Sequence, residues 1–242
     1  MPNAFFHFKL FTIWQEGAAL KVSTEACILG AWAEETGAER ILDIGTGTGI
    51  LALMLAQRYP DATIDAVEID GTAARQATQN VAASPFADRI RVIRQSIQEF
   101  SLFNSQLSIS EGYDLIVSNP PFYQNHLRSP QMARNQALHA VTLTFDALLD
   151  GVGKLLAPTG TFVVLLPPHE MGRLVAKAGG YGLLLQRQLH ISQRPDGRPF
   201  RQISVLGFGA KPVEMEALTI YDAGGQYSAG FTQLLKAYYS IF

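Results

Sequence analysis

The sequence predicts an α/β fold built on a doubly wound, mostly parallel sheet of seven strands. Strands alternate with helices between residues 40 and 166, a glycine-rich turn follows the first of these strands, and two further strands come near the end of the chain. Strand–helix alternation is typical of parallel βαβ units, whose strands are covered on both faces and form short apolar runs. We therefore expect helices on both faces of one sheet, with an antiparallel closing strand.

Each predicted element has its own signal. Residues 40–44 form an apolar run stopped by glycine, and residues 50–58 carry apolar residues at helical spacing. The other expected strands are 63–68, 89–95, 113–118, 160–166, 186–193 and 201–208. The other expected helices are 71–83, 142–156 and 228–239, and residues 101–112 are expected to form a loose polar loop.

The composition indicates one globular domain over residues 1–242, with an N-terminal segment at 1–35 and a C-terminal strand and helix extension at 209–242. Apolar residues make up 48% of the chain, which is enough for a substantial core. The formal net charge is −2. Contact with a nucleic acid would therefore depend on a local basic patch rather than on bulk charge.

Cysteine usage and hydropathy exclude several classes of protein. The single cysteine, Cys27, excludes an intramolecular disulfide and argues against a cysteine-based metal cluster, so we expect it to be a small buried hydrophobe. The N-terminus lacks the apolar region and cleavage site of a signal peptide, and no stretch approaches a membrane span. We predict a cytoplasmic protein that binds no metal, and a monomer is favoured.

The turn from Asp43 to Gly49 is a candidate cofactor loop. Glycines after a strand let a cofactor approach the backbone closely, and the following helix offers free N–H groups. The dinucleotide fingerprint would place its third glycine at position 50, but Ile50 stands there and the glycines are Gly45, Gly47 and Gly49. Asp43 can orient the loop or face the ammonium of a cofactor. A tight turn without a ligand is the alternative.

Glu68 ends the second strand, where an acidic side chain is expected to meet a ribose. Its carboxylate can accept hydrogen bonds from both ribose hydroxyls, which suits NAD and S-adenosylmethionine equally. Ile69, the next residue, and Ile97, after the third strand, are expected to contact the same cofactor. Asp70 is a candidate helix cap.

The fourth strand runs directly into Asn119, Pro120, Pro121 and Phe122. Two consecutive prolines fix φ twice and remove two N–H donors, so this segment is stiff. It follows the carboxyl end of a strand, where ligands bind in open α/β sheets. We interpret the four residues as a catalytic motif, and a Pro-Pro turn with a helix-capping asparagine is the alternative.

The residue types of this motif suit methylation of a planar amine. The lone pair of an exocyclic adenine amine is delocalised into the ring. The side-chain oxygen of Asn119 and the carbonyl of Pro120 can accept hydrogen bonds from the amine. These bonds return electron density to the amine nitrogen and hold it in line with the methyl group to be transferred. Phe122 can stack on the adenine, a contact worth about 1–3 kcal/mol. The methylated amine can lose its proton to solvent, so no general base is required.

A glycine turn followed by Asn-Pro-Pro-Phe resembles the Rossmann-like class I methyltransferases that act on adenine, cytosine or glutamine amide, in which a closing antiparallel pair is usual. Flanking segments narrow the resemblance to the bacterial tRNA1(Val) (adenine(37)-N6)-methyltransferase family, over nearly the whole chain. These segments are Phe6-His-Phe-Lys9-Leu-Phe11, Lys21-Val-Ser-Thr24, Ile28-Leu-Gly-Ala-Trp32, Leu218-Thr-Ile-Tyr221-Asp, Tyr227-Ser and Tyr238-Tyr239. The resemblance implies S-adenosylmethionine as cofactor, S-adenosylhomocysteine as product, and methylation of the N6 amine of adenine 37 in the anticodon loop of tRNA1(Val).

The resemblance also implies further cofactor contacts, from Lys21, Thr24, Ser96 and Asn119. The chain reads Thr-Glu-Ala at 24–26, where the family usually has Thr-Asp-Gly. It reads Gln-Ser at 95–96, where an acid usually meets the cofactor adenine. We expect the hydroxyl of Ser96 to make a weaker contact in place of that acid.

Basic and aromatic residues after the motif and in the last strand pair are candidates for holding an RNA. We expect them to form a phosphate-contacting rim around the pocket, and an ordinary solvated surface is the alternative. The family's Ala-Arg in the loop after the motif is Ala137-Leu138 here, which leaves Arg134 as the nearby cation. The predicted substrate-contacting residues are Phe122, Tyr123, Arg134, Arg194, Arg198 and Arg201.

Three other functions are compatible with parts of the pattern. Release-factor glutamine methyltransferases share the tetrapeptide, but they carry a substantial helical domain before the glycine turn, which begins here at residue 43. A non-catalytic cofactor-binding module that recognises RNA would retain the same fold. A dehydrogenase is disfavoured by Ile50 and by the antiparallel ending.

Overall fold

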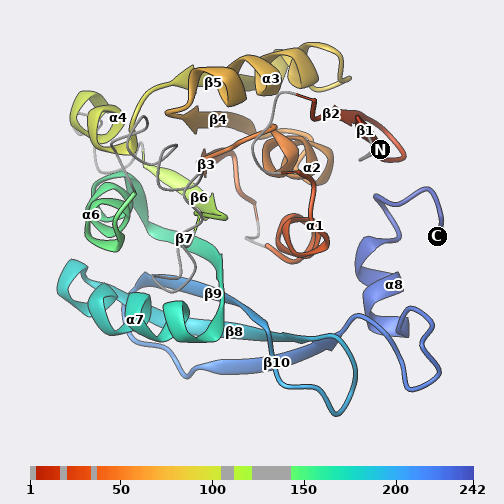
Figure 1. Cartoon of the computed structure of the whole chain (residues 1–242). Coiled ribbons are helices and arrows are strands. Elements are labelled where there is room, and N and C mark those ends of the chain that lie inside the picture. Colours follow the sequence, from red (N-terminus) through yellow and green to blue (C-terminus); the bar gives the residue numbers. More distant parts are fainter. Residues whose placement is uncertain (1–3, 17–20, 34–36, 105–111, 122–142) are drawn as a thin grey trace, which may run out of the picture.

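The structure is a computed structural model that describes residues 4–16, 21–33, 37–104, 112–121 and 143–242. Its strands are β1 (Phe5–His7), β2 (Thr12–Trp14), β3 (Arg40–Ile44), β4 (Thr63–Glu68), β5 (Ile90–Arg94), β6 (Tyr113–Ser118), β7 (Leu156–Leu166), β8 (Leu183–Ser192), β9 (Arg201–Phe208) and β10 (Glu214–Thr219). Its α-helices are α1 (Thr24–Trp32), α2 (Ile50–Arg58), α3 (Gly71–Ala82), α4 (Ile97–Asn104), α6 (Phe145–Leu155), α7 (Pro168–Ala178) and α8 (Ala229–Leu235). Figure 1 shows strands and helices alternating from β3 to β7, as the sequence predicts.

Eight strands form the central sheet, in the order β10-β8-β9-β7-β6-β3-β4-β5. All are parallel except β9, which runs antiparallel between β7 and β8. The predicted doubly wound, mostly parallel sheet with an antiparallel strand is therefore confirmed, but the predicted count of seven strands is wrong. The eighth strand is β10, which lies within the predicted strand and helix extension at 209–242. It joins the sheet at the edge beside β8 and is largely exposed.

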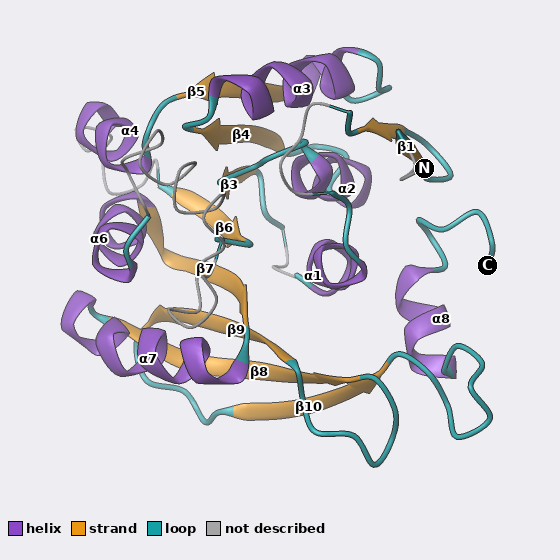
Figure 2. Cartoon of the chain, in the orientation of Figure 1, coloured by secondary structure: helices purple, strands orange, loops and turns teal. Residues whose placement is uncertain are grey.

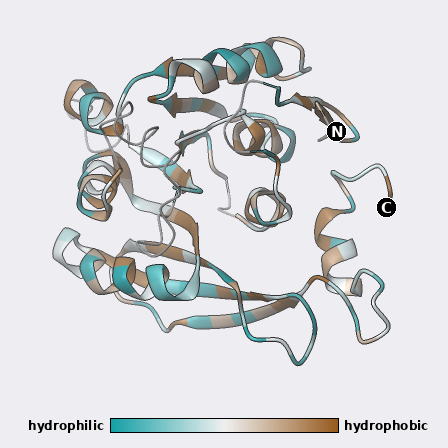
Figure 3. Cartoon of the chain, viewed as in Figure 1, coloured by the Kyte–Doolittle hydropathy of each residue, from teal (hydrophilic) through white to brown (hydrophobic). Residues whose placement is uncertain are grey.

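Helices cover both faces of the sheet (Figure 2). One apolar cluster joins α1, α2, α3 and α8 with the small hairpin β1–β2, and a second cluster joins α4, α6 and α7 to the other face. Figure 3 shows hydrophilic residues along α3 and α7, whose buried residues are confined to one side. Because both faces are covered, the loops at the strand ends are the part of the sheet left to bind ligands.

The β1–β2 hairpin meets the C-terminal residues. Phe8 forms an antiparallel bridge with Tyr239, and the Lys9 amide donates to the carbonyl of Tyr238 at 2.8 Å. The Lys9 ammonium donates to the carbonyl of Phe242, also at 2.8 Å. The described N-terminal hairpin segment therefore lies against the residues that follow α8 (Figure 1).

Three helices lie where the sequence predicts none. α1 is buried from Ala26 to Trp32, so it lacks an amphipathic pattern. α7 follows β7 directly. α4 begins at Ile97, and the predicted loop over 101–112 is therefore wrong for residues 101–104, while 105–111 lie outside the described residues.

The structure also bears on the expectations for Cys27 and for membrane-spanning segments. Cys27 is fully buried, as predicted, and this burial raises the pKa of its thiol to about 12 because desolvation disfavours the thiolate. Among the described residues, no helix combines the length and the apolar character needed to cross a bilayer.

Candidate cofactor and catalytic site

Three glycines shape the turn between β3 and α2. Gly45, Gly47 and Gly49 have φ angles of 74°, 58° and 85°, which other residues adopt only with strain. A Cβ placed on Gly45 or Gly47 would meet nothing within 4 Å, so open space lies beside the loop backbone. The amide of Gly45 donates to the carbonyl of Val67 at 2.8 Å, which fixes the loop to the end of β4.

Asp43, near the end of β3, is fully buried under this loop. Its Oδ2 accepts hydrogen bonds from the hydroxyl of Thr46 at 2.5 Å and from the amide of Ala52 at 3.2 Å. Burial raises the pKa of the carboxyl to about 7, because desolvation disfavours its charged form. Its Oδ1 is buried and has no hydrogen-bond partner among the described residues. Asp43 therefore orients the loop and still has one acceptor atom to offer.

Glu68, at the end of β4, bonds both to the glycine loop and to the N-cap residue of α3. Its Oε2 accepts a hydrogen bond from the amide of Gly47 and its Oε1 accepts one from the amide of Asp70, each at 2.9 Å. A carboxylate oxygen has a second lone pair, so both oxygens can also accept from ribose hydroxyls. Ile69 is 47% exposed and offers apolar surface beside them. Asp70 caps α3, as predicted.

The predicted contacts Lys21 and Thr24 lie at the start of α1, which packs against α2. Arg58, in the last turn of α2, donates to the carbonyl of Ala31, in the last turn of α1. The carboxyl ends of the two helices therefore lie together, and the helices run in the same direction. The N-terminus of α1, with Thr24 as its first residue, is consequently at the same edge of the sheet as the glycine loop.

Ser96 caps α4. Its hydroxyl accepts from the amide of Glu99 at 3.2 Å and donates to the carboxylate of Glu99 at 2.9 Å, and its own amide donates to the same carboxylate oxygen at 3.2 Å. This is a capping box. Sequence reasoning missed Glu99, although the Ser-x-x-Glu spacing was the signal for it. The side chain of Ile97 packs in the second apolar cluster, so it can meet a cofactor only through its backbone.

Asn119 and Pro120 follow β6 at this edge. β6 pairs with β3 so that Ser118 lies opposite Ile44, and the Ser118 hydroxyl donates to the Ile44 carbonyl at 2.9 Å. Asn119 is half-buried and Pro120 is buried. The motif therefore begins on the strand next to the one that carries the glycine loop. Its fourth residue, Phe122, lies outside the described residues.

The structure describes three of the residues that are predicted to contact the RNA substrate. Arg194 and Arg198 are exposed in the connection between β8 and β9, which lies at the carboxyl edge because β9 runs antiparallel to its neighbours. Arg201 begins β9, and its Nη2 lies 3.6 Å from Oε1 of Glu25 in the first turn of α1. Arg201 thus reaches the candidate cofactor site already paired with a carboxylate. Two further predicted substrate residues, Tyr123 and Arg134, lie outside the described residues.

These groups fit the parts of S-adenosylmethionine. The open space beside Gly45 and Gly47 admits a ligand close to the backbone, and the oxygens of Glu68 suit a ribose diol. The unpaired Oδ1 of Asp43 suits an ammonium group. The Ser96 hydroxyl, which we expect to replace the acid of the family, donates to the carboxylate of Glu99, so a carboxylate lies next to the predicted contact.

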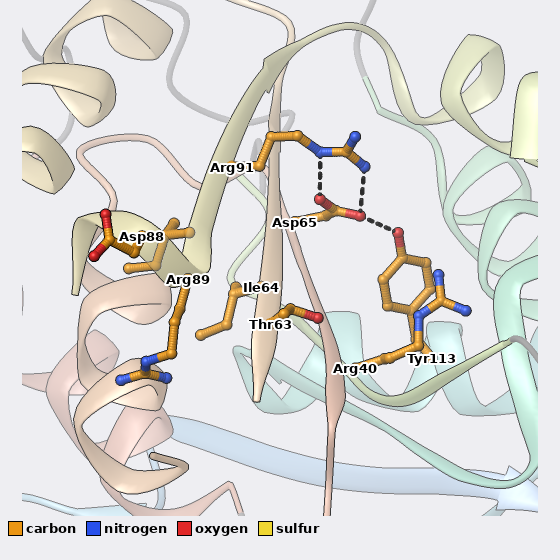
Figure 4. A pocket seen from close by; sticks show the side chains of 9 residues that line it. Arg40, Thr63, Ile64, Asp65, Asp88, Arg89, Arg91 and Tyr113 are labelled. Carbon is orange, nitrogen blue, oxygen red and sulfur yellow. Dashed lines mark hydrogen bonds and ion pairs between the residues drawn. The ribbon is translucent and has the colours of Figure 1, made fainter. Parts of the chain in front are cut away.

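A cavity of about 320 Å³ lies at the opposite, amino edge of the sheet (Figure 4). Asp65 on β4 accepts hydrogen bonds from Nε and Nη2 of Arg91 at 2.8 and 3.0 Å and from the hydroxyl of Tyr113 at 2.5 Å. The guanidinium of Arg40 lies 5.1 Å from the centre of the Tyr113 ring. Arg89 donates to three backbone carbonyls near the end of α2. These groups are paired with one another and hold the strands together.

Comparison with known proteins decides the family. Residues 25–165 match the methyltransferase small domain family. A tRNA1(Val) (adenine(37)-N6)-methyltransferase of Bacteroides thetaiotaomicron is 44% identical over 99% of this chain and 98% of its own length. One of the same name from Dyadobacter fermentans is also 44% identical, over the full length of both chains. The chain belongs to the tRNA1(Val) (adenine(37)-N6)-methyltransferase family.

A solved structure supports the fold of this family member. A predicted O-methyltransferase of Agrobacterium tumefaciens superimposes with a TM-score of 0.67 at 17% identity, over 88% of this chain and 95% of the other. The Rossmann-like methyltransferase fold and the family resemblance seen in the sequence are therefore confirmed. The roles of the individual site residues stay predictions.

Proposed function

We propose that this chain transfers a methyl group from S-adenosylmethionine to the N6 amine of an adenine in tRNA. The names of its relatives favour adenine 37 of tRNA1(Val) as the target. The observation that carries the proposal is the position of Asn119, on the strand next to the glycine loop and held there by the bond between Ser118 and Ile44. This position suits an acceptor that must meet both the substrate amine and the cofactor methyl.

The chain's own groups orient the amine. The side-chain oxygen of Asn119 and the carbonyl of Pro120 accept hydrogen bonds from its two N–H groups, and Phe122 stacks on the base. The bound cofactor supplies an activated methyl group on a sulfonium. With that group bound, the amine lone pair would form the new C–N bond, the C–S electron pair would stay on sulfur, and the surplus proton of the amine would leave to solvent. Alignment of this kind can supply much of the rate enhancement.

Other residues hold the cofactor. Gly45, Gly47 and Gly49 leave room along the backbone, and Glu68 accepts from the ribose hydroxyls. Asp43 accepts from the ammonium through its free oxygen. The remaining proposed contacts come from Lys21, Thr24, Ile69, Ser96 and Ile97.

The RNA is held outside the pocket. Arg194, Arg198 and Arg201 at the carboxyl edge contact phosphates, together with Tyr123 and Arg134 of the segment after the motif. A target base that is stacked within the RNA has to be extruded to reach Asn119. A tRNA substrate favours a cytoplasmic location. We expect one domain, a monomer and no metal.

The test is cofactor-dependent methylation of tRNA transcripts, followed by nucleoside analysis. We expect N6-methyladenosine in tRNA1(Val), and loss of the product when adenine 37 is replaced by guanine. Absence of N6-methyladenosine across a full tRNA pool would contradict the proposal. Methylation of a release factor but not of RNA would establish the glutamine alternative. Mass spectrometry of tRNA from a strain lacking the gene, before and after the protein is restored, tests the same reaction in the cell.

A further inference from the structure

The outer face of the β1–β2 hairpin presents aromatic rings to solvent. Phe5 pairs with Trp14 and His7 with Thr12, so these four side chains share one face, while Ile13 on the other face is fully buried. Phe5 is 39% exposed and Trp14 is 44% exposed. The Phe5 ring centre lies 5.2 Å from that of Trp14 and 4.6 Å from that of His7. Solvent-facing positions of antiparallel strands are ordinarily polar, so this face departs from the pattern.

Asn80 holds this hairpin rigidly. Its Oδ1 accepts a hydrogen bond from the amide of Trp14, and its Nδ2 donates to the carbonyl of the same residue, both at 2.9 Å. The same Nδ2 donates to the carbonyl of Thr48 in the glycine loop at 2.8 Å. Asn80 is fully buried on α3. The backbone that carries the Trp14 ring is therefore attached, through one side chain, to the loop proposed to bind the cofactor.

A nucleobase is the ligand that suits such a face. Unpaired bases of RNA are held mainly by stacking on aromatic side chains, and stacking accepts any base. Rings fixed in advance lose little conformational freedom when a base binds. The chain carries a net charge of −2, so attraction to phosphates gives it less general affinity for RNA than a basic protein has. Stacking contributes affinity without positive charge.

We propose that Trp14, with Phe5 and His7, forms a stacking platform for an unpaired base of the RNA substrate. This inference rests on the proposed tRNA methylation. Figure 1 shows the hairpin beside α2 and α3, and α2 starts at the glycine loop. The platform thus holds RNA at a point separate from the basic connection between β8 and β9.

Tryptophan fluorescence tests this directly. The chain has two tryptophans, and the other, Trp32, is buried with the guanidinium of Arg187 4.0 Å from its ring centre. A Trp32→Phe variant therefore leaves Trp14 as the single reporter. We expect titration with tRNA1(Val) transcript to quench its emission. In the otherwise unsubstituted protein, Trp14→Ala should raise the KM for tRNA roughly tenfold, the size of one base–aromatic stack, with kcat unchanged.

Three controls separate stacking from a structural role of the aromatic pair. Trp14→Phe retains a ring and should recover most of the tRNA affinity. Phe103→Ala removes a ring that is 75% exposed on α4 and should leave the KM unchanged. Calorimetry with S-adenosylmethionine should give the same affinity for Trp14→Ala as for the unsubstituted protein.

Two results would overturn the platform. One is tRNA methylation with no change in Trp14 emission and no change in KM in Trp14→Ala, the result also expected if this face binds a protein. The other is a parallel loss of cofactor and tRNA affinity in Trp14→Ala, which would show that the ring only supports the glycine loop. Failure of the proposed function looks different, because the unsubstituted protein would then methylate no tRNA at all.

Discussion

Asp65, which lines the cavity at the amino edge, and Asp43, which lies under the glycine loop at the carboxyl edge, are on adjacent strands in opposite surroundings. Asp65 accepts hydrogen bonds from Arg91 and Tyr113 through both oxygens. Asp43 has no cation beside it in the described chain, and one of its oxygens is bonded while the other is not. A saturated carboxylate can only stabilise the fold. A buried, unsaturated one costs stability and retains the capacity to bind, which favours the carboxyl edge as the proposed ligand site.

The largest expected effect is at the carboxyl edge, from Asn119→Ala. Loss of one acceptor for the reacting amine should lower kcat by about 100- to 1000-fold, the range found when one oriented hydrogen-bonding group is removed from an active site. Cofactor affinity, measured by calorimetry, should fall far less than kcat, because Asn119 is only one of several predicted cofactor contacts. Asn104→Ala, at the end of α4, is the matched control and should retain activity. Full turnover in Asn119→Ala would remove this residue from the proposed mechanism.

Asp43→Asn should change how stability depends on pH. The pKa of the carboxyl is about 7 in the folded protein, against an ordinary value of 3.8, so between these values the folded state holds more protons than the unfolded state. The contribution of Asp43 is present in full below pH 3.8 and is lost as the pH rises towards 7. The loss is at most about 4 kcal/mol. Urea unfolding of the cofactor-free protein measures the free energy of unfolding at each pH. Between pH 3.8 and 7 the unsubstituted protein should lose stability relative to Asp43→Asn. A constant difference between the two proteins across this window would contradict the prediction.

Glu68→Ala should weaken cofactor binding by roughly 10- to 100-fold, the effect of losing charge-assisted hydrogen bonds. The substitution also frees the amide of Gly47, so the glycine loop loses one of its supports. Calorimetry with S-adenosylmethionine measures the effect. Glu170→Ala removes an acid that pairs with Arg173 on α7, and it should bind the cofactor normally. Equal affinity in both variants would exclude Glu68 from the ribose site.

The smallest effect is expected at the amino edge, from Tyr113→Phe. The hydroxyl bond to Asp65 is lost, and the free energy of unfolding should fall by about 1–2 kcal/mol, as for other hydrogen bonds to a charged group. Methylation kinetics should not change. A change in the KM for tRNA or for the cofactor would show that the amino edge also takes part in binding.

Much of the carboxyl edge was predictable, because its signals are local. An apolar run stopped by Gly45 indicates a strand and its loop, and Asn119 with two prolines marks the end of another strand. Glu68 follows from its place at the end of a strand. Each of these signals is contained in a few consecutive residues, and each has one dominant physical cause.

Two features that the sequence does not place depend on distant partners. Asn80 looks like any polar residue of an exposed helix, and its role appears only when Trp14 and Thr48 are brought to it. The sequence predicts a strand within the 209–242 extension, but its place in the central sheet as β10 depends on the free edge that β8 offers. Glu99 had a local signal in its spacing from Ser96, and that signal was overlooked.

The contact between the β1–β2 hairpin and residues 236–242 bears on the order in which the fold forms. The Lys9 ammonium bonds to the carbonyls of Lys236 and Phe242, across sequence separations of 227 and 233 residues. The hairpin is therefore synthesised well before these partners. Asn80 can fix it to α3 earlier, whereas Phe6 and Phe8 gain their contact with the Tyr239 ring only after the helices and strands of the central sheet have been made. Complete packing of the hairpin is thus a late step of folding during synthesis.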